Sequence, residues 1–206
     1  MVKPNFRELR HAYGFDEVAI VPGDVTINPE QTDVSYTIGK HKFEIPIIAS
    51  AMDGVTDPAF AVRMSKLGGL AVLNLEGVQT RYDNPNEILA KIASAPETEV
   101  TALMQKTYAQ PIREELITAR IKAIKAGGAV CAVSVAPANT KKFVKTIVDA
   151  GADILVVAST VTSVRHISKS EHGLVFEELV NHIHNIVHSL AQITILDPSQ
   201  GIPGTG

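Results

Sequence analysis

The sequence predicts an α/β fold in which about five parallel strands alternate with helices. Short apolar runs recur along the chain, amphipathic helical patterns separate them, and polar residues follow where the runs end. Apolar runs without alternation suit strands covered on both faces, as parallel strands between helices are. Because a barrel needs eight strands, two architectures remain open: a doubly wound sheet, or a barrel that is cut short.

Composition sets the class of protein before any motif is considered. With 206 residues, of which 45% are hydrophobic, the chain can bury a real core as one domain. A net charge of -3 without a basic run gives no electrostatic footprint for nucleic acid, and no apolar run reaches the length of a membrane span. We therefore expect a cytoplasmic protein with no nucleic-acid partner and no membrane partner. The single cysteine, Cys131, excludes a disulfide within the chain and suits a reducing compartment.

Residues 1–44 do not show the strand and helix alternation, and we interpret them as an N-terminal cap. Residues 18–21 form a short apolar run that ends at a Pro-Gly pair. Residues 35–45 alternate weakly around Gly39, which predicts a small hairpin leading into the first parallel strand.

The stretch 45–69 is the first complete unit, with a strand, a polar loop and a helix. Asp57 is placed to cap the helix and Pro58 to occupy its first turn. One helical face is predicted to be apolar, and a pair of glycines ends the helix. The residues expected on that face are Phe60, Met64 and Leu67.

The rest of the chain repeats this unit with one long helical stretch. After a second strand at 70–73, we expect helices that begin at Pro85, near Thr98 and at Pro111, with residues 100–104 as an alternative strand. The remaining predictions are strands at 129–135, 154–157 and 193–196, a helix capped by Asn139 and ended by Gly151, and a helix at 174–190 with Leu179 on its buried stripe. We assign 45–197 to these units and 198–206 to a tail.

Polar residues at the predicted strand ends should meet at one edge, because parallel strands point the same way. The polar residues are Ser50, Asn74, Ser159 and Thr160, and the apolar Met52 is expected at the same edge. Ligands of α/β proteins bind at that edge, so it is the predicted site.

Four segments resemble the IMP dehydrogenase and GMP reductase family, in the right order across residues 13–165. FDEVAIVPG at 15–23 is similar to its F-D-D-V-L-L-V-P segment, and IPIIASAMDGVT at 45–56 to its first-strand P-L-I-S-S-P-M-D-T-V-T. LGGLAVLN at 67–74 is similar to G-G-I-G-F-I-H, and AGADILVVASTVTS at 150–163 to A-G-V-D-V-V-V-L-D-S-S-Q-G. The resemblance implies a partial (β/α)8 TIM barrel, of which this chain is an N-terminal part.

Two further segments, 74–82 and 105–117, most resemble the shorter bacterial IMP dehydrogenase-related proteins. Those proteins lack the CBS domains that many full enzymes carry between the second helix and the third strand. We therefore expect no CBS domains here.

The resemblance also implies roles for individual residues. Ser50 and Met52 match the family residues that touch the sugar and base of the purine nucleotide, and Ser159 and Thr160 match residues that contact the nicotinamide cofactor. Ala158 stands where the family has the Asp that binds the nicotinamide ribose.

The implied activity is hydride transfer between a purine nucleotide, IMP or GMP, and NAD or NADP, in a homo-oligomer that is typically tetrameric. The family's nucleophilic Cys lies in a G-S-I-C-T-type loop that no residue of this chain matches, and Cys131 falls within an apolar strand. Two alternatives follow: a catalytically inactive truncated barrel, or GMP reductase-type activity in the intact form.

Two other candidates favour structural roles. His184 and His188 have the spacing of a metal-binding pair on the predicted helix, but no carboxylate shares their face, so we predict no metal site. Asp53 is interpreted as a residue that bonds the backbone of its own turn.

Overall fold

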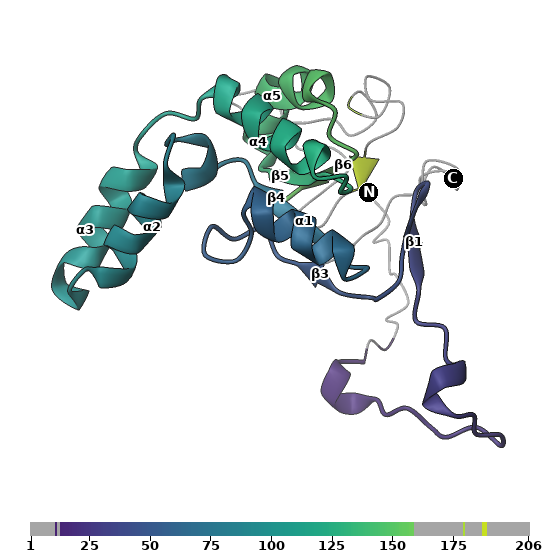
Figure 1. Ribbon diagram of the computed structural model, residues 1–206. Coiled ribbons are helices and arrows are strands. Elements are labelled where there is room, and N and C mark those ends of the chain that lie inside the picture. Colours follow the sequence, from purple (N-terminus) through teal and green to yellow (C-terminus); the bar gives the residue numbers. More distant parts are fainter. Residues whose placement is uncertain (1–10, 12, 159–178, 180–186, 189–206) are drawn as a thin grey trace, which may run out of the picture. The chain divides into compact units, whose positions relative to one another are not determined.

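The computed structural model describes residues 11, 13–158, 179 and 187–188 (Figure 1). By its contacts, the chain divides into two units, Met1–Asp33 and Val34–Gly206. In the first unit, the short 3-10 helices η1 (Phe15–Glu17) and η2 (Pro29–Gln31) flank an extended segment. The apolar run predicted in this segment is exposed, with Ile20 at 99%.

The second unit is built on a parallel sheet of five strands, and the strand order follows the chain order. The strands are β3 (Ile48–Ala49), β4 (Leu70–Asn74), β5 (Ala132–Val135), β6 (Ile154–Val157) and β7 (Val187–His188). The α/β class and the parallel sheet predicted from the sequence are confirmed. Within the described residues, β3 and β7 do not pair with each other, so the barrel is not closed there.

Helices α1 (Pro58–Lys66), α4 (Glu114–Ala126) and α5 (Pro137–Ala150) cover one face of the sheet (Figure 1). Their apolar stripes meet alternate residues of the strands in the main core. Its fully buried members, with at most 1% exposure, are Leu73, Leu75, Ile117, Ile121, Ile124, Cys131, Val133, Val135, Phe143, Ile147, Leu155 and Val157. Burial of this much apolar surface is the main favourable term in the folding of this unit.

A hairpin covers the opposite face of the sheet. Its strands β1 (Tyr36–Ile38) and β2 (His41–Phe43) pair antiparallel, as predicted. The hairpin side chains of Ile38 and Phe43 join a second buried cluster with strand residues that point away from the helices. The strand residues in this cluster are Leu70, Val72, Ala132, Ile154 and Val156.

Helices α2 (Pro85–Ser94) and α3 (Glu97–Tyr108) follow β4 and precede α4 in the chain, and they form a pair that extends away from the sheet (Figure 1). The helix predicted near Thr98 is therefore confirmed, and the alternative strand at 100–104 is wrong. Only two residues of the pair are fully buried, Pro85 and Thr107.

Several sequence predictions need correction at element ends. Asn139 does not cap α5, because the helix begins earlier, with Pro137 in its first turn. Leu67 follows α1 and is exposed, since the helix ends at Lys66. The third helix of the long stretch begins at Glu114 rather than Pro111.

The last predicted elements are only partly described. Residues 187–188 form strand β7, where the sequence pattern predicts the end of a helix. Leu179 is buried in the main core, as its place on a buried stripe predicts. The predicted strand at 193–196 and the tail at 198–206 lie outside the described residues.

Candidate functional site

The carboxyl edge of the parallel sheet brings together the loop after β3 and the end of β4. Ser50 and Met52 directly follow β3, and Asn74 is the last residue of β4. Register pairs Ala49 with Ala71, so these two strands run side by side to the same edge. Ser159 and Thr160, which the resemblance assigns to cofactor binding, lie outside the described residues.

Hydrogen bonds between residues of the loop after β3 close this loop. The hydroxyl of Thr56 donates to the carbonyl oxygen of Ser50 at 2.9 Å, and the Thr56 N–H donates to Met52 O at 2.9 Å. Within this closed turn the Ser50 side chain is exposed, and the Met52 side chain is 58% exposed. Both side chains are therefore available to a ligand at the edge of the sheet.

Asp53 ties this loop to two distant parts of the chain. Its Oδ2 atom accepts a hydrogen bond from Val78 N–H at 3.0 Å and another from the Tyr108 hydroxyl at 2.7 Å. The Asp53 side chain is buried. Partial burial of the Tyr108 phenol, and then its hydrogen bond to Asp53, raise the pKa of Tyr108 to about 12. Asp53 therefore makes structural hydrogen bonds, but its partners, Val78 and Tyr108, lie outside the turn that the sequence interpretation assigned to it.

Gly77 makes room for the Asp53 carboxylate. A Cβ atom at position 77 would lie 1.8 Å from Oδ1 of Asp53, far inside any van der Waals contact. Gly77 precedes the 3-10 helix η3 (Val78–Thr80), whose first N–H group is the one that Asp53 accepts. Asp53 therefore caps a helix that begins 25 residues later in the chain.

An open groove lies between the loop after β3 and the α2–α3 pair. It has a volume of about 750 Å³. Its walls are mostly apolar, and its polar members include Asp53 and Asn74. Its lining includes Met52, Asn74, Leu89, Ile92, Met104 and Tyr108. A concave, largely apolar surface with a few polar groups is the usual form of a small-molecule site.

Glu76 occupies the N-terminus of α5. One carboxylate oxygen accepts from Ala136 N–H at 2.7 Å, and the other accepts from the Asn139 side-chain amide. The N-terminus of a helix favours negative charge, and Glu76 supplies it from the loop that follows β4. Sequence reasoning missed this contact, since the two partners are 60 residues apart.

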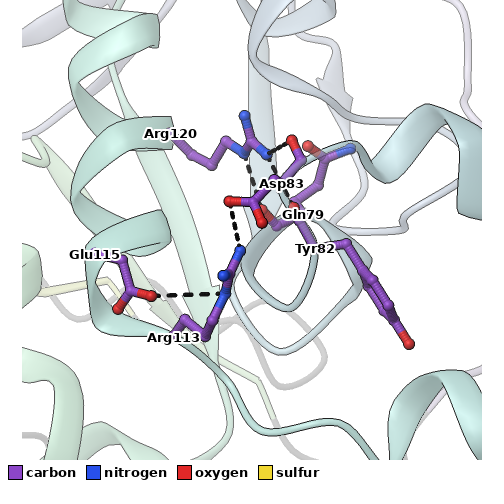
Figure 2. A network of polar contacts seen from close by, with 6 residues as sticks. All are labelled: Gln79, Tyr82, Asp83, Arg113, Glu115 and Arg120. Atoms are coloured by element: carbon purple, nitrogen blue, oxygen red, sulfur yellow. Dashed lines mark hydrogen bonds and ion pairs between the residues drawn. The ribbon is translucent and has the colours of Figure 1, made fainter.

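Arg120 on α4 and Arg113 just before α4 both contact the segment between η3 and α2 (Figure 2). The Arg120 guanidinium donates to the carbonyl oxygens of Gln79 at 2.9 Å, Tyr82 at 3.1 Å and Asp83 at 2.9 Å. Arg113 forms an ion pair with the Asp83 carboxylate at 2.7 Å and holds the pKa of that carboxyl below its usual value. Arg120 therefore fixes the base of the α2–α3 pair to α4.

Cys131 has no access to a substrate. Its side chain is buried, and burial raises the pKa of the thiol to about 12. Its backbone N–H donates to Asp153 at 2.8 Å, and Asp153 also pairs with Lys125 at 2.6 Å. The interpretation of Cys131 as a buried, inert residue agrees with this environment, although β5 begins one residue later.

Two further predictions from the sequence concern a metal site and a membrane-spanning segment. Among them, no cluster of three or more His, Cys, Asp or Glu side chains could hold a metal ion. His188 lies in strand β7, so the predicted helical spacing with His184 does not apply to it. His184 itself lies outside the described part of the chain. Over that same part, no helix combines the length and apolar character needed to cross a membrane.

One protein family and several known proteins are similar to most of this chain. The family described as IMP dehydrogenase / GMP reductase domain matches residues 12–190. An oxidoreductase of Mycolicibacterium smegmatis is 32% identical over 182 residues, which is 86% of this chain and 48% of the relative. The inosine-5'-monophosphate dehydrogenase of Methanocaldococcus jannaschii is 42% identical over 67 residues, or 32% of this chain and 14% of that enzyme.

A solved structure supports the same relationship. The crystal structure of an IMP dehydrogenase/GMP reductase-like protein from Corynebacterium glutamicum superposes with a TM-score of 0.79 at 29% identity. The match covers 91% of this chain and 51% of the other. The chain thus spans about half the length of the relatives that match most of it.

Proposed function

Because the chain belongs to the IMP dehydrogenase / GMP reductase family, we propose that it forms one wall of a purine-nucleotide site in an oxidoreductase. Relatives described as oxidoreductases and as IMP dehydrogenase support this class. The proposed reaction of the intact enzyme is hydride transfer between a purine nucleotide, IMP or GMP, and NAD or NADP. GMP reductase-type activity remains the alternative direction.

The observation that carries the proposal is the loop after β3. It places the exposed residues Ser50 and Met52 at the carboxyl edge of a parallel sheet, and Met52 also lines the open apolar groove. The Ser50 hydroxyl can bond the hydroxyl groups of a ribose, and the Met52 thioether can lie against the face of a base. The loop keeps its shape through the bonds of Thr56 and Asp53, so both groups are positioned before a ligand arrives.

The described residues at the end of β6 offer no side chain that would bind the ribose of a nicotinamide cofactor. Ala158 stands at the position of the family's ribose-binding Asp, and its methyl side chain cannot accept a hydrogen bond. Its backbone N–H is already bonded to Val135 O at 3.0 Å. NAD or NADP is therefore proposed at the level of the family, and no step of the reaction is assigned to this chain through it.

A second candidate is a chain that binds nucleotide without turning it over. Nucleophilic catalysis in this family's reaction requires a thiolate, and the single cysteine of these 206 residues is buried with a pKa of about 12. Within the described residues, β3 and β7 are also left as open edges of the sheet. Open edges favour association, which supports the proposal of a homo-oligomer.

The test is to measure binding and turnover separately on the purified 206-residue chain. Calorimetry with IMP, XMP and GMP should give saturable binding of at least one nucleotide, and Ser50→Ala should weaken it severalfold. Ser94→Ala is a matched control, because Ser94 is an exposed serine on α2 that bonds the carbonyl of Lys91. Absence of binding by all three nucleotides would overturn the proposed function.

Assays with IMP and NAD, and with GMP and NADPH, then separate the two candidates. We expect no turnover, since the chain offers no accessible thiolate. Measurable turnover with either pair would rule out the inactive chain. Light scattering on the same samples tests the oligomer proposal, which predicts a mass above that of one chain.

A further inference from the structure

The groove beside the loop after β3 has a second wall, and that wall comes from the α2–α3 pair. Leu89 and Ile92 of α2 line it together with Met104 and Tyr108 of α3. The matched family segments implicate the loop after β3 and leave these helical residues without a role. The helical wall is therefore distinct from the loop wall that the family resemblance implicates.

Two exposed methionines mark the groove. Met52 is 58% exposed on the loop wall, and Met104 is 42% exposed on the helical wall, although both side chains are strongly apolar. Core formation explains neither, whereas Met64 on α1 is buried in the usual way. Thioether groups are polarizable and make favourable contacts with aromatic rings, so a flat heteroaromatic ring is the ligand that suits both.

One hydrogen bond connects the helical wall with the loop wall. The Tyr108 hydroxyl on α3 donates to Asp53 at 2.7 Å, and Asp53 is adjacent to Met52 in the loop. Val78 N–H donates to the same Oδ2 atom of Asp53, and Gly77 lies against the Oδ1 atom of this carboxylate. The separation of the loop and α3 is thus fixed by a buried carboxylate rather than by apolar contact alone.

The groove also offers a polar group for the edge of a ring. Asn74 lines it, and the Oδ1 atom of Asn74 already accepts the Glu76 N–H at 2.9 Å. Since the oxygen is engaged, the amide NH₂ is the group that Asn74 can offer to a ligand. A purine carries acceptor atoms on its edge and two apolar faces, and it matches this combination.

Resting on the proposed function, we propose that α3 supplies the second wall of the base site. Met104 contacts the flat ring of the bound purine, and Tyr108, acting through Asp53, is a positioning residue for the loop that carries Met52. The helical pair then selects ligands that carry a base and has no effect on the recognition of a sugar phosphate.

Methionine methyl NMR gives a direct readout, because the chain has four methionines and three of them are informative. With IMP as the probe, the methyl signals of Met52 and Met104 should both shift by ring current, and that of buried Met64 should stay in place. Ribose 5-phosphate, which lacks a base, should shift none of the three. A shift at Met52 without one at Met104 would overturn the second wall and leave the proposed function standing.

The same titrations distinguish the other failures. If IMP shifts no methyl signal, the proposed function fails and this inference fails with it. If NAD shifts Met104 and IMP does not, the groove takes the cofactor, and the assignment to the purine is wrong. Met104→Ala should raise the Kd for IMP about fivefold or more and leave the thermal midpoint within the range of other exposed substitutions.

The role of Tyr108 is tested in the free protein and then with IMP. Tyr108→Phe should speed amide exchange at Val55 and Thr56, whose N–H groups bond to Met52 O, and should shift the Met52 methyl signal. Gly77→Ala should do the same by displacing Asp53, whereas Gly54→Ala has open space around its added Cβ. Tyr108→Phe and Gly77→Ala should each weaken IMP binding severalfold, and Gly54→Ala should not.

Tyr82→Phe is the matched control. It removes a tyrosine hydroxyl that bonds α3 through Thr107 O at 3.1 Å, next to Tyr108, without touching Asp53. It should leave loop exchange and the Met52 signal unchanged. If Tyr82→Phe and Tyr108→Phe have equal effects on the loop, Tyr108 acts only by holding α3, and its positioning role is overturned.

Discussion

The pair α4–α5 and the pair α2–α3 both carry an apolar stripe in sequence, yet they are held in place differently. Three isoleucines of α4 and two stripe residues of α5 are fully buried against the sheet. The α2–α3 pair buries only its end residues, Pro85 and Thr107, and is attached through hydrogen bonds of Arg120, Tyr82 and Tyr108. Apolar burial fixes the scaffold, whereas directional polar contacts fix the wall of the groove.

The largest expected effect is in the scaffold. Ile121→Ala removes a fully buried side chain from α4 and should cost about 2–5 kcal/mol in the free energy of unfolding. The matched variant Ile88→Ala, at a half-buried position of α2, should cost less than about 1.5 kcal/mol. Urea denaturation measures both, and equal losses would remove the distinction between the two pairs.

A middle-sized effect is expected where the two regions join. Arg120→Lys replaces two separate guanidinium nitrogens, which reach three carbonyl oxygens, with one ammonium nitrogen that cannot occupy both positions. Hydrogen bonds to charged groups contribute about 1.5–3 kcal/mol, so we expect a loss of about 2 kcal/mol. Hydrogen exchange should rise in residues 79–83. Arg113→Lys is the control, because its partner Asp83 is 81% exposed, and the unfolding midpoint should not move. Unchanged exchange in Arg120→Lys would mean that α2–α3 is fixed by apolar contact after all.

The smallest effect concerns the titration of Tyr108. Its pKa is raised from 10.0 to about 12 in the folded state, so the neutral phenol stabilises the fold fully below pH 10 and this contribution is lost as the pH rises toward 12. Asp53→Asn removes the charge that adds to the effect of burial and should bring the pKa of Tyr108 partway down. Tyrosinate absorbance near pH 11 should therefore be higher in Asp53→Asn than in the wild type. Asp57→Asn changes a helix cap without a tyrosine partner, and a matching rise there would contradict the assignment.

Elements that depend on local pattern could be predicted from the sequence. Pro85 predicted the start of α2, and Asp57 with Pro58 predicted the start of α1. The parallel sheet followed from apolar runs that lack alternation.

The candidate site could be predicted only in part, because its geometry depends on pairs far apart in sequence. Asp53 and Tyr108 are separated by 55 residues, and Glu76 and Ala136 by 60. No periodicity carries such a pairing. The error at Asn139 has the same origin: Glu76, in the loop after β4, supplies the negative charge at the start of α5, so the helix needs no capping side chain of its own.

The agreement between strand order and chain order has a consequence for how the protein is made. Each strand from β4 to β7 pairs with the strand that precedes it in the chain, so no strand must wait for a partner that is synthesised later. A nascent chain can therefore add one strand and its helix at a time to a sheet that has already formed, as N-terminal segments fold first during synthesis. At each step, the strand added last supplies the sheet edge with which the next strand pairs.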